Sequence, residues 1–306
     1  MSQPETIRIY VGADRSQQLA VRVLEYSIKR HTDATVEVHP MVDLEVPTPR
    51  DPRQGQRTGF SFSRFCIPRL AGYRGRAIYM DADMQVFRDI RELWNLPFAG
   101  RKVLVQEEVK HLAATLKLSN APAKRIKQCA VMLLDCGRLD WDIADIVRHL
   151  DEGDYSYEQL MYDLCLLPED DVGYTVPFEW NSLEHFDAET RLIHYTDMGT
   201  QPWVSTANPN GGLWIAEVRR MLDEGVLTLA EVKGEVDAGF FRPSLLRDLK
   251  WRHRVPRLLL PWFDRVNANI DRAGGFVVHK AVYEAKRRRK QAIKDYERRA
   301  TEQAVS

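Results

Sequence analysis

The sequence lacks any run of about 18 apolar residues, the length that a membrane-spanning helix needs. Its first residues show no basic stretch followed by an apolar core, so no signal peptide is expected. Cysteines are few, and no two of them form a Cys-x-x-Cys pair. All have apolar neighbours in the sequence, which favours reduced, buried thiols in a cytosolic protein. The four cysteines are Cys66, Cys129, Cys136 and Cys165.

The chain also lacks a net charge, because 44 Lys and Arg residues balance 44 Asp and Glu residues. The two signs are unevenly distributed. Residues 242–306 contain 17 basic and 7 acidic residues, a net charge of +10, so the first 241 residues carry −10. Such an asymmetry concerns partners and solubility rather than fold. With 306 residues available, we expect one main domain over residues 1–240 and a basic, helical extension over 241–306.

Two carboxylates follow directly after an apolar stretch. Residues 77–80 have the pattern of a buried strand, Asp81 and Asp83 come next, and an apolar stretch resumes at Met84. Alternate residues of a strand share a face, so the two carboxylates would project the same way. Such a pair is costly unless a cation neutralises it, and a divalent metal with oxygen ligands does so. The alternative is a solvated turn that happens to hold two acidic residues.

The N-terminal part alternates strand and helix. Residues 7–11 predict a strand, Gly12–Asp14 a turn, and residues 19–28 an amphipathic helix, before a second strand at 35–39. This order is typical of an α/β fold with a mostly parallel central sheet flanked by helices. Ligands of such sheets bind at the carboxyl ends of the strands. Asp14 and the Asp81/Asp83 pair are therefore expected at the same edge.

Further strands are expected at 102–106, at 130–135, where the apolar run indicates a central position, and at 191–195, which contains His194. A loop rich in Pro and Arg spans residues 47–58 and is either a basic lid over a phosphate or a solvated connection. Arg64 follows among aromatic residues and needs an anionic partner.

The C-terminal part mixes Arg with Leu, Pro, Trp and Phe over residues 251–266, and residues 286–290 are all basic. This composition suits a peripheral contact with an anionic membrane. A helix that is solvated on its charged face is the equally weighted alternative. We find no folded motif that reads bases, so no nucleic-acid partner is expected.

In this order, the motifs resemble glycosyltransferase family 8, the glycogenin and lipopolysaccharide galactosyl- and glucosyltransferase group, which has the GT-A fold. The resemblance spans roughly residues 7–215. The Asp-x-Asp motif alone would be weak, whereas the whole series with the late His-Tyr…Pro-Trp is specific. The matching segments are Gly12–Asp14, Ser61–Arg64 with Pro68, Tyr79–Asp83, Gln128–Asp135, Glu158–Gln159, Val176–Asn181, His194–Tyr195 and Gly199–Trp203.

The resemblance implies a retaining glycosyltransferase that moves a hexose from a UDP-sugar, with UDP-glucose or UDP-galactose expected as donor. Its cofactor would be Mn²⁺ (or Mg²⁺), bound by Asp81, Asp83 and His194. The acceptor would be a glycan or a lipid-linked glycan of the cell envelope, and the enzyme would be cytoplasmic or peripheral on the inner face of the membrane. Selection of the sugar depends on a few hydroxyl contacts that motifs do not reveal.

The same resemblance assigns the remaining site residues. The donor would be held by Gly12, Ala13, Asp14, Arg64, Ala82, Gly199 and Gln201, besides the metal ligands. Gln159, with Glu158 beside it, would lie closest to the anomeric carbon. Asp135 would orient sugar hydroxyls, unless it only caps the following helix.

Three departures from the family pattern are visible. Gln128 and Ala130 replace the usual Asn and Gly, the loop after His194 is one residue longer, and Gln201 replaces a Lys that contacts the diphosphate. Arginines of the 47–58 loop would have to supply the missing charge. The replacement at Gln201 leaves one alternative open, a catalytically silent nucleotide-sugar-binding or scaffold protein of the same fold. A second alternative is a phosphatase of the haloacid-dehalogenase type, whose Asp-x-Asp motif also follows an apolar strand, although Gln85 stands where that motif wants Thr or Val.

Overall fold

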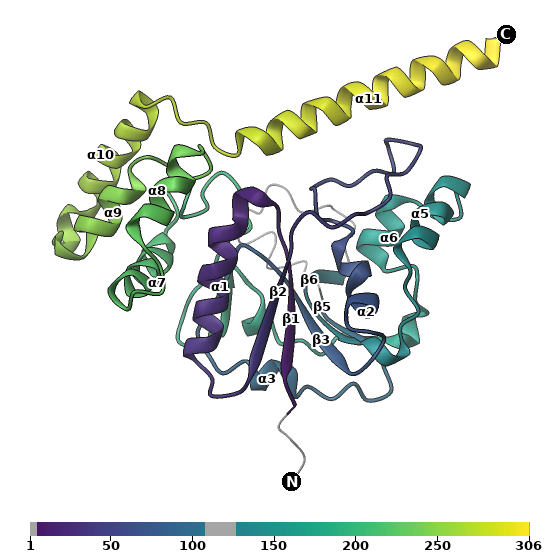
Figure 1. Ribbon diagram of the computed structural model, residues 1–306, viewed down its shortest axis with the longest axis horizontal. Coiled ribbons are helices and arrows are strands. Elements are labelled where there is room, and N and C mark those ends of the chain that lie inside the picture. Colours follow the sequence, from purple (N-terminus) through teal and green to yellow (C-terminus); the bar gives the residue numbers. More distant parts are fainter. Residues whose placement is uncertain (1–4, 108–126, 306) are drawn as a thin grey trace.

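The computed structural model describes residues 5–107 and 127–305. Its centre is a six-stranded sheet with the strand order β2-β1-β3-β6-β5-β7. Helices cover both faces of this sheet, as Figure 1 shows. The strands are β1 (Ile7–Gly12), β2 (Val36–Met41), β3 (Arg76–Asp81), β5 (Val103–Glu107), β6 (Lys127–Asp135) and β7 (Val172–Gly173).

The sheet is mixed, as expected. Strand β1 pairs in parallel with both β2 and β3, and β5 pairs in parallel with β7. Strand β6 lies at the centre, where its apolar composition placed it, but it runs antiparallel to both β3 and β5. The α/β fold and the central position of this strand are therefore confirmed, whereas its direction was not apparent from the sequence.

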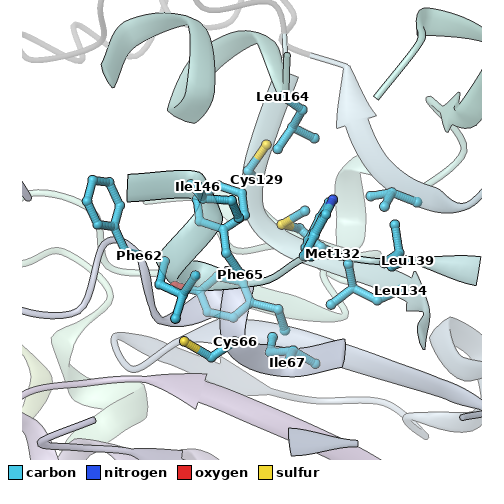
Figure 2. Close-up of a cluster of buried hydrophobic side chains, with 14 of the residues drawn as sticks. Phe62, Phe65, Cys66, Ile67, Cys129, Met132, Leu134, Leu139, Ile146 and Leu164 are labelled. Atoms are coloured by element: carbon cyan, nitrogen blue, oxygen red, sulfur yellow. The ribbon is translucent and has the colours of Figure 1, made fainter. Parts of the chain in front are cut away.

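The first face of the sheet is covered by a large apolar cluster. Helix α2 (Ile67–Leu70), helix α5 (Ile143–Glu152) and helix α6 (Tyr157–Asp163) pack there. Figure 2 shows part of this cluster, in which Phe65 and Ile67 lie close to Met132 and Leu134 of β6. Helix α5 begins at its N-cap Asp142 and ends at Gly153, whose φ of 81° suits glycine.

The opposite face is covered by helix α1 (Gln18–Arg30) and helix α3 (Arg91–Trp94). In α1, residues at helical spacing such as Val21, Leu24 and Ile28 are buried against the sheet. Short 3-10 helices connect these elements. They are η1 (Arg15–Gln17), η2 (Ser63–Cys66), η3 (Cys136–Arg138), η4 (Glu169–Asp171) and η5 (Phe178–Trp180).

A second, three-stranded sheet carries the late histidine. It consists of β4 (Met84–Val86), β9 (Leu192–His194) and β8 (Ser182–Leu183), in this order. Strand β4 follows β3 after a two-residue bend and pairs antiparallel with β9, so that Met84 lies opposite His194. The pairing brings the end of β9 back to the acidic bend.

The described chain is helical from Gly211 onward, and this includes the expected helical extension over residues 241–306. The helices of this part are α7 (Gly211–Asp223), α8 (Leu229–Asp237), α9 (Leu245–Trp251), η6 (Arg252–Arg254), η7 (Arg257–Leu259), α10 (Leu260–Ala273) and α11 (Lys280–Val305). A third apolar cluster continues across residue 240, because Phe241, Leu245 and Leu249 pack with Trp203 and Trp214. Helix α11 extends across the edge of the central sheet at which β1 ends (Figure 1).

The buried environment expected for the cysteines holds for Cys66, Cys129 and Cys136. Cys165 is exposed, so the expectation is wrong at this position. Its apolar neighbours in sequence belong to the end of α6 and the turn after it, where Leu164 turns inward with a left-handed φ of 49°. Across the described residues, no helix combines the length and the apolar composition that crossing a membrane requires.

Candidate metal centre

Three ligand-type side chains meet at the junction of the two sheets. Asp81 is the last residue of β3, Asp83 lies in the bend before β4, and His194 ends β9. The backbone N–H of Tyr195 donates to the carbonyl of Asp83 at 2.8 Å, which holds β9 against the bend. One ligand atom from each of Asp81, Asp83 and His194 lies within 4.8 Å of the others, and Nε2 of His194 is 3.1 Å from Oδ1 of Asp83.

The orientation of His194 is set by residues behind it. Its Nδ1 lies 2.9 Å from Oδ1 of Asn181, and Nδ2 of Asn181 donates to Oε1 of Gln106 at 2.8 Å. Because the amide nitrogen of Asn181 faces Gln106, its amide oxygen faces the histidine and accepts a hydrogen bond from Nδ1–H. Nε2 is then the nitrogen left for a metal, and a partner of this kind is typical of metal-ligating histidines.

Asp81 is contacted from the other side by a buried pair. The Tyr79 hydroxyl donates to Oδ1 of Asp81, and Nη2 of Arg64 lies 3.1 Å from that hydroxyl and 3.8 Å from Oδ1 of Asp81. A second bond from Arg64 reaches the carbonyl of Cys129 at 2.6 Å. Arg64 thus has the anionic partner that its surroundings predicted, and it partly neutralises the acidic pair.

The charges of this cluster perturb one another. Burial raises the pKa of Asp81; Arg64 opposes this effect, and the neighbouring charge of Asp83 reinforces it. Burial by itself lowers the pKa of His194, but the carboxylates of Asp83, Asp81 and Glu184 outweigh burial and raise it. The Asp81 shift is thus mainly an effect of burial, whereas the His194 shift is an effect of the negative charge around the ring.

The donor set fits a divalent cation. It combines two carboxylates with one imidazole, which suits Mn²⁺ better than Ca²⁺, and the imidazole is already held in the tautomer that a metal needs. The cation would also oppose the burial, and after it the repulsion by Asp83, that raise the pKa of Asp81.

Gln201 adjoins this centre as a buried residue. Its Nε2 donates to Oδ2 of Asp83 at 2.8 Å and to the carbonyl of Tyr195 at 3.0 Å, while its Oε1 is buried without a partner. The side chain therefore positions Asp83. Gly199 lies in the exposed turn before it, where its N–H donates to Oδ1 of Asp197 at 2.9 Å.

The end of β1 lies directly beside the acidic pair, because Gly12 is the register partner of Asp81. A Cβ on Gly12 would lie 2.5 Å from the Tyr79 hydroxyl, so the glycine is required by packing. Asp14 is the N-cap of η1, where its carboxylate accepts a hydrogen bond from the backbone N–H of Ser16, and it is partly exposed at this edge. The side chains of Ala13 and Ala82 are buried in the core, which leaves only their backbones for a ligand.

Glu158 and Gln159 lie at the start of α6. The Oε1 atom of Gln159 accepts from the backbone N–H of Ser156 and so closes a capping box. Glu158 is exposed and accepts from Nη2 of Arg57 at 2.6 Å. Glu158 therefore contacts the 47–58 loop, whereas the side chain of Gln159 is bonded within its own helix start.

Asp135 is not brought to the centre. It pairs with Arg76 at the beginning of β3, whereas Asp81 ends that strand. At about 3.3 Å per residue, the two carboxylates are separated by nearly the full length of β3. The antiparallel direction of β6 is the cause, because it turns the carboxyl end of this strand to the opposite edge.

Sequence reasoning missed the residues that support the ligands. Asn181 belongs to a quoted motif, but nothing in its neighbours indicated a bond to His194. Gln106 could have been noticed only as a polar residue in an apolar strand. Tyr79 likewise looked like an ordinary strand residue, although its hydroxyl links Arg64 to Asp81.

Residues 7–131 match the sequence model of the family described as Glycosyl transferase family 8. Among curated proteins, Protein CDI of Arabidopsis thaliana is 26% identical over 218 residues, which cover 66% of this chain and 81% of that protein. Among solved structures, the galactosyltransferase LgtC in complex with donor and acceptor sugar analogues matches with a TM-score of 0.53 at 14% identity. That match covers 75% of this chain and all of the LgtC chain (100%).

The bifunctional glycosyltransferase WbbM matches with a TM-score of 0.50 at 15% identity over 71% of this chain. Only half of the WbbM chain is covered (50%), so this chain spans about half the length of that relative. At such identities, the likeness to LgtC and WbbM establishes a shared fold. The family model that matches residues 7–131 is not one of haloacid-dehalogenase phosphatases, and the fold is shared with the glycosyltransferases LgtC and WbbM.

Proposed function

We propose that this chain, whose residues 7–131 belong to glycosyltransferase family 8 and whose fold is GT-A, transfers a hexose from a UDP-sugar to a glycan or lipid-linked acceptor with retention of configuration. Family and fold indicate a glycosyltransferase. The observation that carries the finer proposal is the convergence of Asp81, Asp83 and a tautomer-fixed His194 beside Gly12 and Asp14.

Asp81, Asp83 and Nε2 of His194 would hold the cation, for which Mn²⁺ is the proposed identity. When bound, it supplies Lewis-acid stabilisation of the departing diphosphate. The protein's own contribution is to prepare the ligands. Asn181 fixes the imidazole tautomer, Gln201 holds Oδ2 of Asp83, and Tyr79 holds Oδ1 of Asp81.

Asp14 is the proposed contact for the base or ribose of the donor, because it is partly exposed at the edge where β1 meets Asp81. In the proposed step, the bond between the anomeric carbon and the diphosphate oxygen breaks, and the acceptor oxygen bonds to the same face of that carbon. The acceptor's hydroxyl proton passes to the departing diphosphate, so that UDP leaves with the electron pair of the broken bond. Gln159 and Glu158 stay candidates for contacts near the anomeric carbon.

Thermal shifts with a panel of UDP-sugars, with and without Mn²⁺, test this proposal. A donor at a hundred times its dissociation constant stabilises the protein by about 2.7 kcal/mol. One sugar should raise the melting temperature only with Mn²⁺, and Asp83→Ala should abolish the effect. Asp140→Ala, which removes an exposed carboxylate, is the matched control. The absence of a Mn²⁺-dependent shift with every UDP-sugar would contradict the proposal.

A catalytically silent protein of the same fold is the second candidate. The observation in its favour is the neutral, buried Gln201, which contacts Asp83 without adding positive charge. Turnover separates the two candidates, because an active enzyme hydrolyses its donor slowly even without acceptor. Binding of a UDP-sugar with no UDP release in the presence of Mn²⁺ would favour the silent protein. The anomeric configuration of a product, read by NMR, tests retention.

A lipid surface is the proposed neighbour of the C-terminal helices, with the inner face of the membrane as the expected location. Leu258, Leu259 and Trp262 are 94%, 51% and 62% exposed, and Arg257 and Arg265 beside them are exposed too. Apolar side chains ringed by arginines suit anionic lipid. Leu258→Ser with Trp262→Ser should reduce flotation with anionic vesicles, whereas Leu229→Ser, an exposed residue elsewhere, should not. If the Leu258→Ser/Trp262→Ser variant floats with anionic vesicles as well as the Leu229→Ser control does, the membrane contact is refuted.

A further inference from the structure

A histidine of the C-terminal segment lies beside the candidate metal centre. His279 directly precedes α11, with a left-handed φ of 46°. Its ring makes a hydrogen bond to the backbone at Met198, in the turn that follows β9. Nε2 of the same ring is shielded from solvent and has no hydrogen-bond partner. The bond to Met198 is therefore made by Nδ1, and Nε2 has no partner within the described residues.

The surroundings of this ring are those of the donor site. Burial lowers the pKa of His279, and the charge of Lys286 adds to this effect, whereas the carboxylates of Asp14 and Asp83 oppose it. Asp14 follows the end of β1, and Asp83 is one of the three candidate metal ligands. A buried nitrogen without a partner costs free energy, so an unpaired one calls for an explanation such as a missing ligand. A ligand that spans from Asp14 to Asp83 would pass this nitrogen.

Arg64 and the arginines of the 47–58 loop do not offer the site a free positive charge. Arg64 is already engaged with Tyr79 and Asp81. The arginines of the 47–58 loop, which were expected to provide the charge, are paired with acidic residues. These ion pairs are Arg50 with Asp151, Arg53 with Asp51, and Arg57 with Glu158. A diphosphate bound beside the carboxylates of Asp14, Asp81 and Asp83 would therefore receive no unpaired arginine from this loop.

The position of His279 suits a phosphate better than the metal. The group of ligand atoms within 4.8 Å of one another consists of Asp81, Asp83 and His194 and does not include His279. A diphosphate bound to the cation extends beyond this group. A protonated imidazole is a strong donor to a phosphate oxygen.

The segment around His279 is fixed to the body at two places. Before it, Phe276 and Val278 pack against the third apolar cluster. After it, Nη2 of Arg289 donates to the carbonyl of Arg53 at 3.0 Å, and the Arg53 guanidinium lies over the Tyr296 ring at 5.4 Å. Helix α11 therefore joins the third cluster to the 47–58 loop, across the sheet edge at which β1 ends (Figure 1).

We propose that His279 binds the diphosphate of the nucleotide-sugar donor through Nε2, so that the C-terminal segment completes the donor site. The inference rests on the proposed function. When the diphosphate binds, the ring takes up one proton from solvent, Nδ1–H stays on Met198, and Nε2–H donates to a phosphate oxygen. No covalent bond between heavy atoms changes.

Calorimetric titration of the full-length chain with UDP at saturating Mn²⁺ tests the inference. His279→Leu should weaken UDP binding by about tenfold or more, the effect of losing a hydrogen bond to a charged group. His279→Gln keeps an N–H donor and should recover part of the affinity. His253→Leu removes an exposed histidine that contacts Arg219, and it should bind UDP like the wild type. Mn²⁺ affinity without nucleotide should be the same in all four proteins.

Three results would overturn the role of His279. The first is an unchanged UDP affinity in His279→Leu. The second is a loss of Mn²⁺ affinity in that variant without nucleotide, which would make the ring a metal ligand. The third is an equal loss for uridine, which carries no phosphate. A wild type that binds Mn²⁺ but not UDP would refute the proposed function itself, and this inference with it.

Discussion

Asn181 gives the sharpest test of how the metal ligands are prepared. It is fully buried (0% exposed), accepts from Nδ1–H of His194 at 2.9 Å and donates to Gln106 at 2.8 Å. Replacement by Leu, which has a similar volume, removes both bonds and leaves the His194 ring free to change tautomer. Loss of such a supporting partner typically lowers metal affinity by about 10- to 100-fold, or about 1.4–2.7 kcal/mol.

The free energy of unfolding should fall as well. Asn181→Leu leaves the buried amide of Gln106 without this partner, which costs about 1–3 kcal/mol. The double variant Asn181→Leu/Gln106→Leu should recover part of this stability, because both polar groups are then gone, but it should not recover the Mn²⁺ affinity. The two effects therefore separate the fold from the site.

The assay is a Mn²⁺ titration followed by electron paramagnetic resonance, together with urea unfolding of each variant. Asn267→Leu is the matched control, since Asn267 is also fully buried (0% exposed) and both of its side-chain polar atoms lack a partner. The control should keep the wild-type Mn²⁺ affinity. A folded Asn181→Leu protein that binds Mn²⁺ as tightly as the wild type would refute the reasoning.

Three further predictions concern stability and pH. Asp248→Ala should lower the free energy of unfolding in urea by about 3–5 kcal/mol, because it leaves the charge of Arg242, which is 1% exposed, without its carboxylate partner. A change below about 1 kcal/mol would contradict this prediction. The folded pKa of His194 is raised above 6.5, so the metal-free protein should keep the stabilisation from the His194–Asp83 pair below pH 6.5 and lose it as pH rises through that pKa. Mn²⁺ affinity should rise over the same interval, and a pH-independent affinity would argue against His194 as ligand. Gly12→Ala should destabilise by about 1–3 kcal/mol, since the new Cβ would be 2.5 Å from the Tyr79 hydroxyl, and Tyr79→Phe should relieve part of this loss in thermal melts.

The local patterns of the sequence predicted much of the architecture. The alternation around β1 and the apolar run before Asp81 identified two strands, because side-chain period and burial are properties of a few consecutive residues. The rule that parallel strands end at one edge predicted Asp14 and Asp81 at the same edge, and the register confirms that β1 ends there, with Gly12 opposite Asp81. The expected helical character of the C-terminal part is likewise borne out.

Asp135 shows that such local patterns do not predict the direction of a strand. Its strand was predicted and its central position is confirmed, but the sequence pattern is the same whichever way the strand runs. Direction depends on how the chain returns to the sheet, and β6 returns antiparallel to β3. A residue expected near the donor sugar therefore lies at the opposite edge.

The sequence by itself determined most of the strands, the two adjacent carboxylates and the family resemblance, because each of these depends on short, contiguous segments; the two-residue strands β7 and β8 were not predicted. Only the tertiary structure decided the partners: Asn181 against His194, Gln201 against Asp83, and His279 close enough to Asp14 for its carboxylate to act on the ring. The residues of each pair are between 13 and 265 positions apart, counted from their residue numbers. These pairs follow from the pairing of β4 with β9 and from the path of the C-terminal segment, neither of which leaves a local signal.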